Sequence, residues 1–403
     1  MSSEAIPSPT EQLPTTKSAK SYLARVVDET ISRGGARFGL FWIGAIGLCA
    51  LLASFLASSH PYLMKANGGW SSPLLRHLSP ADVALPVLVV LTGLFLKLKW
   101  LGPAARWITF CFVGAAVIFG CVWLIKPPRA IVYDQYRQKQ RSGQIQWALF
   151  APIPYSPSDR LRDQPTLIHP MPPNRAHWMG TDRHGSDMVS KMIHACRIAM
   201  AVGFIATGIA LVIGVSVGAV MGYFAGLVDL IGMRVVEVVA AIPTFFLLLS
   251  FVAFFPRNLY VMMVIIGITG WVGYARFTRA EFLKLRQQDF VLAARACGLP
   301  LTSILARHML PNGVAPVMVE ASFGVAAAIL YESTLSFLGL GLIEQPSWGQ
   351  LLQQASSSGA SFYWWLASFP GLAIFFTVFG YNLVGEALRD AIDPHRPTVV
   401  SSR

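Results

Sequence analysis

Long apolar runs are the feature that most constrains how this chain can fold. A helix of about 20 residues crosses the hydrocarbon core of a bilayer, where every backbone polar group must be paired internally. The sequence contains eight runs of suitable composition: 38–57, 82–98, 105–125, 197–226, 232–256, 258–275, 313–341 and 366–386. They predict an all-α polytopic membrane protein with about eight transmembrane helices.

Composition supports this class and disfavours others. Of the 403 residues, 54% are hydrophobic and only 13% are charged, whereas soluble domains carry about 25% charged residues. The net charge of +12 does not indicate nucleic acid, because no basic run is interleaved with aromatic residues that could stack on bases. We therefore expect lipid, and no nucleic acid, as a partner.

The basic residues also predict an orientation in the inner membrane, because short cytoplasmic loops are enriched in Lys and Arg. The expected order is a cytoplasmic tail (1–37), N-terminal helices (38–126), a periplasmic segment (127–196), a core (197–386) and a second cytoplasmic tail (387–403). We expect 38–57 to remain as a membrane helix, since it is longer than the apolar region of a signal peptide. Both termini then lie in the cytoplasm.

Four glycines in the run 197–226 are spaced four residues apart: Gly214, Gly218, Gly222 and Gly226. Residues at this spacing share one helix face, and the missing side chains allow a second helix to approach closely. We predict a packing ridge here, in preference to a merely flexible helix.

Patterns for catalysis or metal binding are missing from the sequence. It contains no Walker A, HExxH or CxxC pattern, so we expect no enzyme activity, no metal and no cofactor bound by this chain. Its five cysteines follow no metal or disulfide spacing. The histidines His169, His177, His184 and His194 are close in sequence, but their spacing matches no ligand pattern.

The segment 276–312 is a candidate docking loop. Asp289 is a suitable N-cap for a short helix, and Gly298 with Pro300 ends it. A second helix is expected to start near Thr302 and to stop before Pro311.

Small residues give the first of these helices a smooth face, which could enter a groove on another protein. Ala293 and Ala294 provide that face, and Arg286, Arg295 and Arg307 could meet acidic residues. The alternative is an ordinary loop with an interfacial helix.

This segment resembles the EAA loop of ABC-importer permeases. Ala293, Ala294, Gly298, Leu310 and Pro311 match that motif at the same spacing, whereas Leu292 replaces its Glu and His308 occupies a hydrophobic position. The resemblance implies a coupling helix, at 289–299, that fits a cleft on a separate ATPase subunit. We expect Asp289, Arg295 and Arg307 to contribute to this coupling together with the motif residues.

The resemblance extends over about residues 165–395. The stretches HWMGTDRHGSDM (177–188), AIPTFFLLL (241–249), YESTLSFLGLG (331–341) and NLVGEALRDAIDPH (382–395) are similar to C-type permease subunits of the dipeptide/oligopeptide/nickel importer family. It implies a type I ABC importer permease core. The implied partners are a second homologous permease subunit, two ATPase subunits that hold ATP and Mg²⁺, and a periplasmic solute-binding protein. Two N-terminal spans are additional to the family pattern.

Carboxylates within apolar runs are costly unless they face protein or water, and they often mark a solute path. We take Glu332, Tyr331, Glu320 and Trp348 as candidates for such a path. The alternative for Glu332 is a structural hydrogen bond. Glu237 is expected to pair with Arg234, and Trp348, Trp364 and Trp365 are expected at the outer membrane interface.

These features favour a permease subunit of an ATP-driven importer for peptides or peptide-like solutes that works by alternating access. Import of nickel or another small solute is the alternative within this class. An ion-coupled secondary transporter is a third possibility, but the sequence shows no clear internal repeat.

Overall fold

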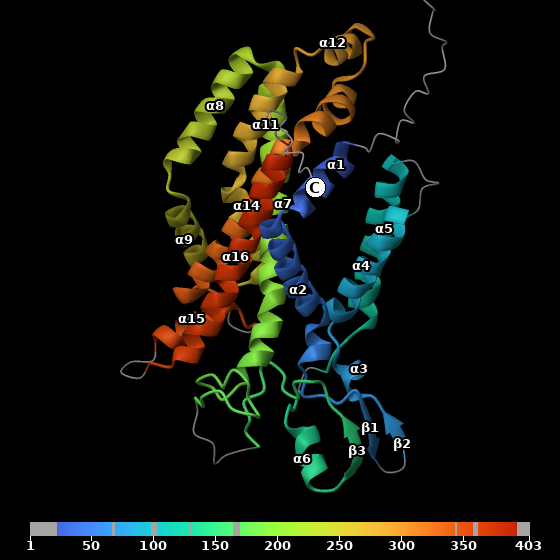
Figure 1. Ribbon diagram of the computed structural model, residues 1–403, viewed down its shortest axis with the longest axis vertical. Helices are drawn as coiled ribbons and strands as arrows, with labels where there is room; N and C mark the ends of the chain where they lie inside the picture. Colours follow the sequence, from blue (N-terminus) through green and yellow to red (C-terminus); the bar gives the residue numbers. More distant parts are fainter. Residues whose placement is uncertain are drawn as a thin grey trace, which may run out of the picture.

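The computed structural model describes residues 22–66, 69–97, 103–128, 131–163, 170–342, 345–357 and 362–392 (Figure 1). Most of the terminal tails and His169 lie outside the described residues. The N-terminal elements are α1 (Tyr22–Ser32), α2 (Gly34–Leu56), β1 (Leu63–Ala66), β2 (Gly69–Ser71), α3 (Pro73–His77), α4 (Pro80–Lys97), α5 (Pro103–Leu124), α6 (Gln135–Arg141) and β3 (Ile145–Leu149). They are followed by α7 (Met188–Phe224), α8 (Gly226–Ala241), α9 (Thr244–Phe254), α10 (Leu259–Thr269), α11 (Trp271–Leu285), α12 (Asp289–Ala296), α13 (Leu301–Ser303), the π-helical η1 (Ile304–Met309), α14 (Leu310–Phe337), α15 (Trp348–Ser356) and α16 (Trp364–Ile392).

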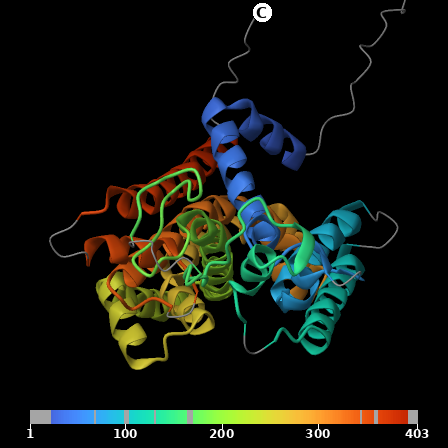
Figure 2. The same cartoon turned by 90° about the horizontal axis from the view of Figure 1, so that it is seen from below.

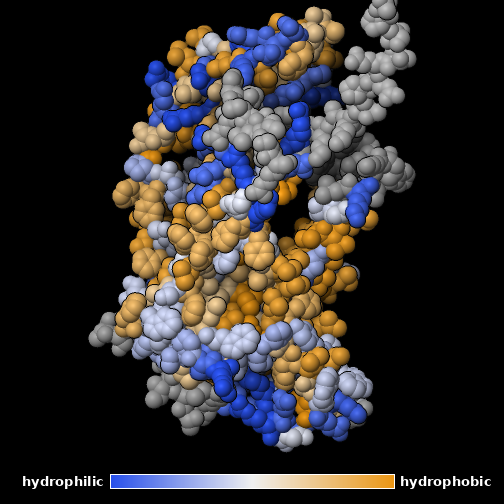
Figure 3. Space-filling model, in the orientation of Figure 1, coloured by the Kyte–Doolittle hydropathy of each residue, from blue (hydrophilic) through white to orange (hydrophobic). Residues whose placement is uncertain are grey.

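Membrane-spanning helices dominate the described residues. Four are long and apolar enough to cross a bilayer: α2, α7, the continuous helix 301–337 and α16. Two bent pairs, α8 with α9 and α10 with α11, bring the number to six, and α4 and α5 add two shorter apolar helices. Figure 3 shows the resulting apolar belt between polar ends. The prediction of about eight membrane helices is confirmed.

Two of the predicted spans are not straight. The run 232–256 divides into α8 and α9, which meet at an angle of 77°. Pro243 stands at the break, and proline interrupts a helix because it lacks a backbone N–H and clashes with the preceding turn. The run 258–275 bends by 40° near Gly270 and continues as α11 to Leu285. Residues 276–285, predicted as loop, are therefore helical.

A close contact between α7 and α11 forms the centre of the bundle, and it is the most extensive helix pair among the described residues. Gly214, Gly218 and Gly222 of α7 all face α11. A Cβ added to Gly218 would lie 2.5 Å from the carbonyl oxygen of Ala275 and 3.0 Å from the amide nitrogen of Arg279. Backbone therefore packs directly on backbone along this seam.

Gly226 does not belong to that seam, and its predicted role is wrong. It has a φ of +55° at the start of α8, and nothing lies within 4 Å of a Cβ placed on it. Its neighbour Ala225 also has a positive φ of 53°. The glycine accommodates the reversal between α7 and α8 because it has no Cβ to clash in this conformation.

The additional N-terminal part stands on one side of the bundle, opposite α8 and α9 (Figure 2). It consists of the α4–α5 hairpin and a three-stranded antiparallel sheet of order β2-β1-β3, so the fold is not purely helical. Asp82 of α4 pairs with Arg197 of α7 and accepts a hydrogen bond of 2.7 Å from Ser54. This ion pair fastens the hairpin to the core.

A second buried network holds the sheet region together. Arg137 lies 2.5 Å from a carboxylate oxygen of Asp159 and 2.8 Å from one of Asp163, and Ser59 donates to Asp159 at 2.5 Å. Both carboxylates come from the loop that leads back toward α7. Residues near the start and the end of the additional N-terminal part, Ser59 and Asp159, are thus linked by a charge-assisted hydrogen bond, which is stronger than a neutral one.

The seam predicts that alanine substitutions at two glycines of α7 differ sharply in their effect on stability. Gly218→Ala should destabilise the protein by about 1–3 kcal/mol, because the added methyl meets rigid backbone and the helices must separate. Gly208→Ala is the matched control, since nothing lies within 4 Å of a Cβ there. Thermal unfolding in detergent is the measurement, and equal midpoints for both variants would contradict the close packing.

The sheet region should lose stability in acid. His60 is buried and its ring stacks on His77 with centroids 3.9 Å apart. Burial and the neighbouring His77 lower the pKa of His60 to about 4, against the smaller opposing effect of Asp159. The unfolded segment thus binds more protons than the folded one between pH 6.5 and 4, and stability falls as the pH drops through this window.

Hydrogen exchange of residues 58–77, corrected for its intrinsic pH dependence, measures this effect. The wild type should lose protection between pH 6.5 and 4, whereas His60→Gln should show a flatter profile because glutamine does not titrate. Identical profiles for the two proteins would assign the acid sensitivity to another group.

Candidate functional site

A short helix projects from one end of the bundle (Figure 1). This helix, α12, begins at Asp289 directly after Gln288, whose side chain forms no capping hydrogen bond. The predicted N-cap role of Asp289 is therefore wrong, and its carboxylate instead lies in the positively polarised first turn. Gly298 has a φ of +70° and follows the C-cap residue Cys297, as expected for a glycine that ends a helix.

The two alanines of the motif lie on different faces of α12. Val291 and Ala294 are buried against Phe282 of α11 and Met309 of η1. Ala293 is exposed. The expected smooth face made of both alanines is therefore wrong: Ala294 anchors the helix, because positions three residues apart share a face and Val291 is its neighbour.

The exposed face of α12 is apolar and basic. It presents Phe290 and Leu292, which are 40% and 48% exposed, together with Ala293 and Arg295. The guanidinium of Arg295 lies 4.5 Å from the ring centroid of Tyr223 and donates to its hydroxyl at 3.2 Å. This cation–π contact fixes the side chain at the edge of the face.

The segment after α12 differs from the prediction of a second, separate helix. Residues 301–337 form one continuous helix in which η1 is π-helical. Pro311 follows η1 in the first turn of α14. A proline lacks the N–H for an α-helical hydrogen bond, and the wider π-turn accommodates this loss. Leu310 packs partly against the cluster that holds Val291, whereas Pro311 and Arg307 are exposed.

A cavity of about 370 Å³ lies deeper in the bundle, between α7, the α8–α9 break, α10, α11 and α14. Glu320 and Tyr331 of α14 line it, with Thr207 of α7 and Tyr274 of α11. Glu320 is the one carboxylate among its described lining residues.

Two glycines make room for the polar groups of this cavity. A Cβ on Gly273 would lie 3.1 Å from the carboxylate of Glu320, and a Cβ on Gly324 would collide with the Tyr274 hydroxyl. The polar side chains therefore rest against bare backbone. Because an ionised carboxylate within a membrane must face protein or water, Glu320 occupies a position suited to contact a polar solute.

Glu332 and Trp348, two of the predicted solute-path residues, do not line this cavity. Glu332 is 2% exposed and accepts hydrogen bonds from Ser336 at 2.7 Å and Ser333 at 3.4 Å. The indole N–H of Trp348 donates to the carbonyl oxygen of Met192. Trp348 thus joins α15 to α7. Ser333 and Ser336 belong to α14 itself, so Glu332 makes the structural hydrogen bonds that were its alternative role from sequence.

The tryptophans expected at the outer membrane interface differ in burial. Trp348 and Trp365 are 2% and 7% exposed and belong to the main core cluster, so their expected place is wrong. Trp365 donates to the carbonyl oxygen of Thr181 at 3.2 Å. Trp364 is half-exposed. The predicted pair of Arg234 and Glu237 is present at 2.6 Å.

The described histidines of the 169–194 segment serve different purposes. His177 is buried and lies 2.8 Å from Asp187, the N-cap of α7. His194 contacts the carbonyl oxygen of Ala57 at 3.1 Å, and His184 is exposed. Within the described ranges, no group of three potential metal ligands occurs.

Sequence reasoning missed Tyr274 and Thr207, because each reads as an ordinary residue of an apolar helix. The proline at 243 was a usable signal for the α8–α9 break. Asp82 was also available as an acidic residue at the start of an apolar run, but its partner Arg197 is distant in sequence.

Comparisons with known proteins agree with this architecture. Residues 214–396 match the family described as "Binding-protein-dependent transport system inner membrane component". The inner membrane ABC transporter permease protein YejE of Escherichia coli (strain K12) is 30% identical over 348 residues, which are 86% of this chain and 89% of that protein. A match of this extent reaches well into the additional N-terminal part.

Two further relatives match a shorter part of the chain. The oligopeptide transport system permease protein OppC of Haemophilus influenzae is 38% identical over 54% of this chain and 70% of its own length. The dipeptide transport system permease protein DppC of Bacillus subtilis (strain 168) is 36% identical over 56% and 70%, respectively.

Among solved structures, the inward-facing MetNI methionine ABC transporter aligns at 18% identity with a TM-score of 0.42, over 51% of this chain and 98% of the other. That likeness is too low to define the fold by itself. The sequence relatives decide the family: this chain belongs to the inner membrane permease components of binding-protein-dependent ABC transport systems.

Proposed function

We propose that this chain is one of two homologous permease subunits of an ATP-driven importer for peptides or peptide-like solutes. The observation that carries the proposal is α12, a rigidly anchored helix with an exposed apolar and basic face at one end of a membrane bundle. Similarity to oligopeptide and dipeptide permeases supports the solute class. Nickel or another small solute is the alternative, and no observation on the described residues favours it.

In this proposal, α12 lies in the cytoplasm and transmits movement from separate ATPase subunits, which hold ATP and Mg²⁺. The mechanical link is short. Val291 and Ala294 pack on Phe282 of α11, and α11 is fixed to α7 by the glycine seam. A displacement of α12 is therefore passed to the centre of the bundle as a rigid-body motion, since packed helices do not deform continuously.

A second link reaches the broken helix pair. Arg279 of α11 forms a two-point ion pair with Asp229 of α8. Helix α8 leads to the break at Pro243, and both α8 and α9 line the cavity that contains Glu320. Movement of α11 can thus change the shape of the cavity, as alternating access between two sides of a membrane requires.

With α12 in the cytoplasm, both termini also lie in the cytoplasm, and the β-sheet end lies on the outer side of the membrane. A solute-binding protein would deliver its cargo there. The basic segments at 25–37 and 276–307 support this arrangement, because short cytoplasmic segments are rich in Lys and Arg.

Docking through α12 is tested by Ala293→Asp. The substitution places a charge in the exposed apolar face without touching buried residues, and it should reduce co-purification of the ATPase subunit about tenfold, since an unpaired buried charge at an interface is costly. Ala176→Asp, at an exposed position at the opposite end, is the control. Normal ATPase assembly with Ala293→Asp would remove α12 from the interface.

The role of Glu320 is tested by Glu320→Gln, which preserves the shape of the side chain and removes its charge. Uptake of a peptide with a free amino terminus into proteoliposomes should fall about tenfold if the carboxylate contacts the ammonium group. Glu237→Gln, which disrupts only an exposed ion pair, should transport normally because such pairs contribute little. Full uptake by Glu320→Gln would exclude Glu320 from the solute path.

A further inference from the structure

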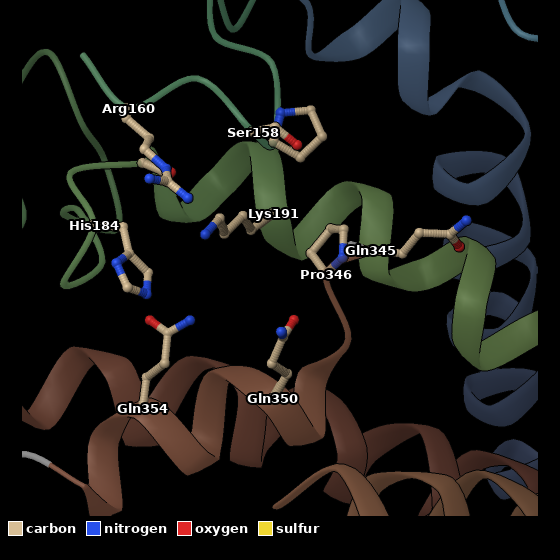
Figure 4. Close-up of a pocket in the computed structure, with 10 residues that line it drawn as sticks. Ser158, Arg160, His184, Lys191, Gln345, Pro346, Gln350 and Gln354 are labelled. Atoms are coloured by element: carbon tan, nitrogen blue, oxygen red, sulfur yellow. The ribbon is translucent and has the colours of Figure 1, made fainter. Parts of the chain in front are cut away.

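A second cavity of about 420 Å³ lies between the start of α7 and α15, at the end of the molecule opposite α12 (Figure 1). Figure 4 shows residues that line it. This open cavity is bordered by the 157–160 loop, by the turn before α7 and the first residues of that helix, and by α15 with the residues that precede it. Arg160, His184 and Lys191 surround it from one side, and Gln350 and Gln354 extend from α15 on the other (Figure 4).

The cavity carries an excess of positive charge. Lys191 pairs with Asp182, and the same carboxylate accepts hydrogen bonds from the backbone amides of His184 at 2.9 Å and Ser186 at 2.7 Å. Asp182 therefore neutralises Lys191 and accepts three hydrogen bonds. No Asp or Glu is among the described residues that line the cavity. Arg160 adds a guanidinium group, and no carboxylate among the described lining residues faces it.

The opposite wall is formed by amides. Gln350 and Gln354 are four residues apart on α15, so they share one helix face. The amide nitrogen of Gln350 donates to the carbonyl oxygen of Leu342 at 3.2 Å, which holds this side chain in place. Gln354 points across the cavity toward His184 (Figure 4).

We propose that this cavity binds a carboxylate group. The guanidinium of Arg160 offers the planar pair of donors that matches a carboxylate, and Lys191, His184 and Gln354 add further donors from other directions. Among the described lining residues, Pro157 and Pro346 are the apolar ones, and the others carry polar or charged groups. Its volume accommodates the end of a short peptide or one acidic side chain.

The source of the carboxylate rests on the proposed function. If the β-sheet end receives a loaded binding protein, the carboxylate belongs either to the terminus of the delivered solute or to an acidic residue on the surface of the binding protein. The chemistry in the cavity is the same for both sources.

Direct binding separates this inference from the proposed transport activity. The full complex in lipid nanodiscs is titrated with N-acetyl-alanine and with its uncharged amide, and binding is followed by saturation-transfer NMR. If the solute supplies the carboxylate, the acid binds and the amide does not. Arg160→Gln and His184→Gln then weaken binding of the acid about fivefold or more. Arg175→Gln, an exposed residue outside the cavity, leaves it unchanged.

The second measurement detects a carboxylate from the binding protein. In this case the free acid does not bind, but Arg160→Gln raises the concentration of binding protein that gives half-maximal ATP hydrolysis about fivefold, whereas Arg175→Gln does not. The inference is overturned if Arg160→Gln matches Arg175→Gln in both measurements. A wild-type complex that binds the acid but shows no response to any loaded binding protein would refute the proposed function and leave the carboxylate site standing.

Discussion

The direct contact of α7 with α11 is the constraint on which the remaining structure depends. Three glycines of α7 allow the α11 backbone to approach so closely that a Cβ at any of the three positions would collide with it. In a bilayer, helix association depends on packing because apolar surface gains little by leaving lipid. Close packing along this seam therefore provides the attraction between helices that the hydrophobic effect provides in water.

Several functional elements are positioned by this one contact. Tyr274 of α11 lines the cavity that contains Glu320. Phe282 of the same helix packs against α12, and Arg279 pairs with Asp229 of α8. The projecting helix, the broken helix pair and the cavity are therefore attached to the same rigid element. This arrangement explains how a force applied at the end of the bundle can reach its centre without a flexible connection.

The additional N-terminal part is joined to the core in a different way. Its attachment relies on the ion pair of Asp82 with Arg197, whereas Arg137 and its two aspartates hold the sheet region itself together. Elsewhere α4 and α5 present exposed apolar side chains such as Val90, Phe112 and Phe119, as suits helices surrounded by lipid. The hairpin can thus be added without altering the packing of the helices that surround the central cavity.

The sequence by itself determined the class of protein, the number of membrane helices, the resemblance to permeases and three of the four packing glycines. These properties follow from local composition and spacing, because lipid imposes a fixed helix length and a four-residue period places glycines on one face. Only the tertiary structure decided which carboxylate faces a cavity. Glu320 and Glu332 lie in the same helix and look equivalent in sequence, but distant segments decide their surroundings: Gly273 of α11 lies beside Glu320, whereas α15 packs through Gly349 on Ser333, next to Glu332. The same is true of Ala293 and Ala294, whose burial depends on where α11 and η1 lie, and no pattern within α12 contains that information.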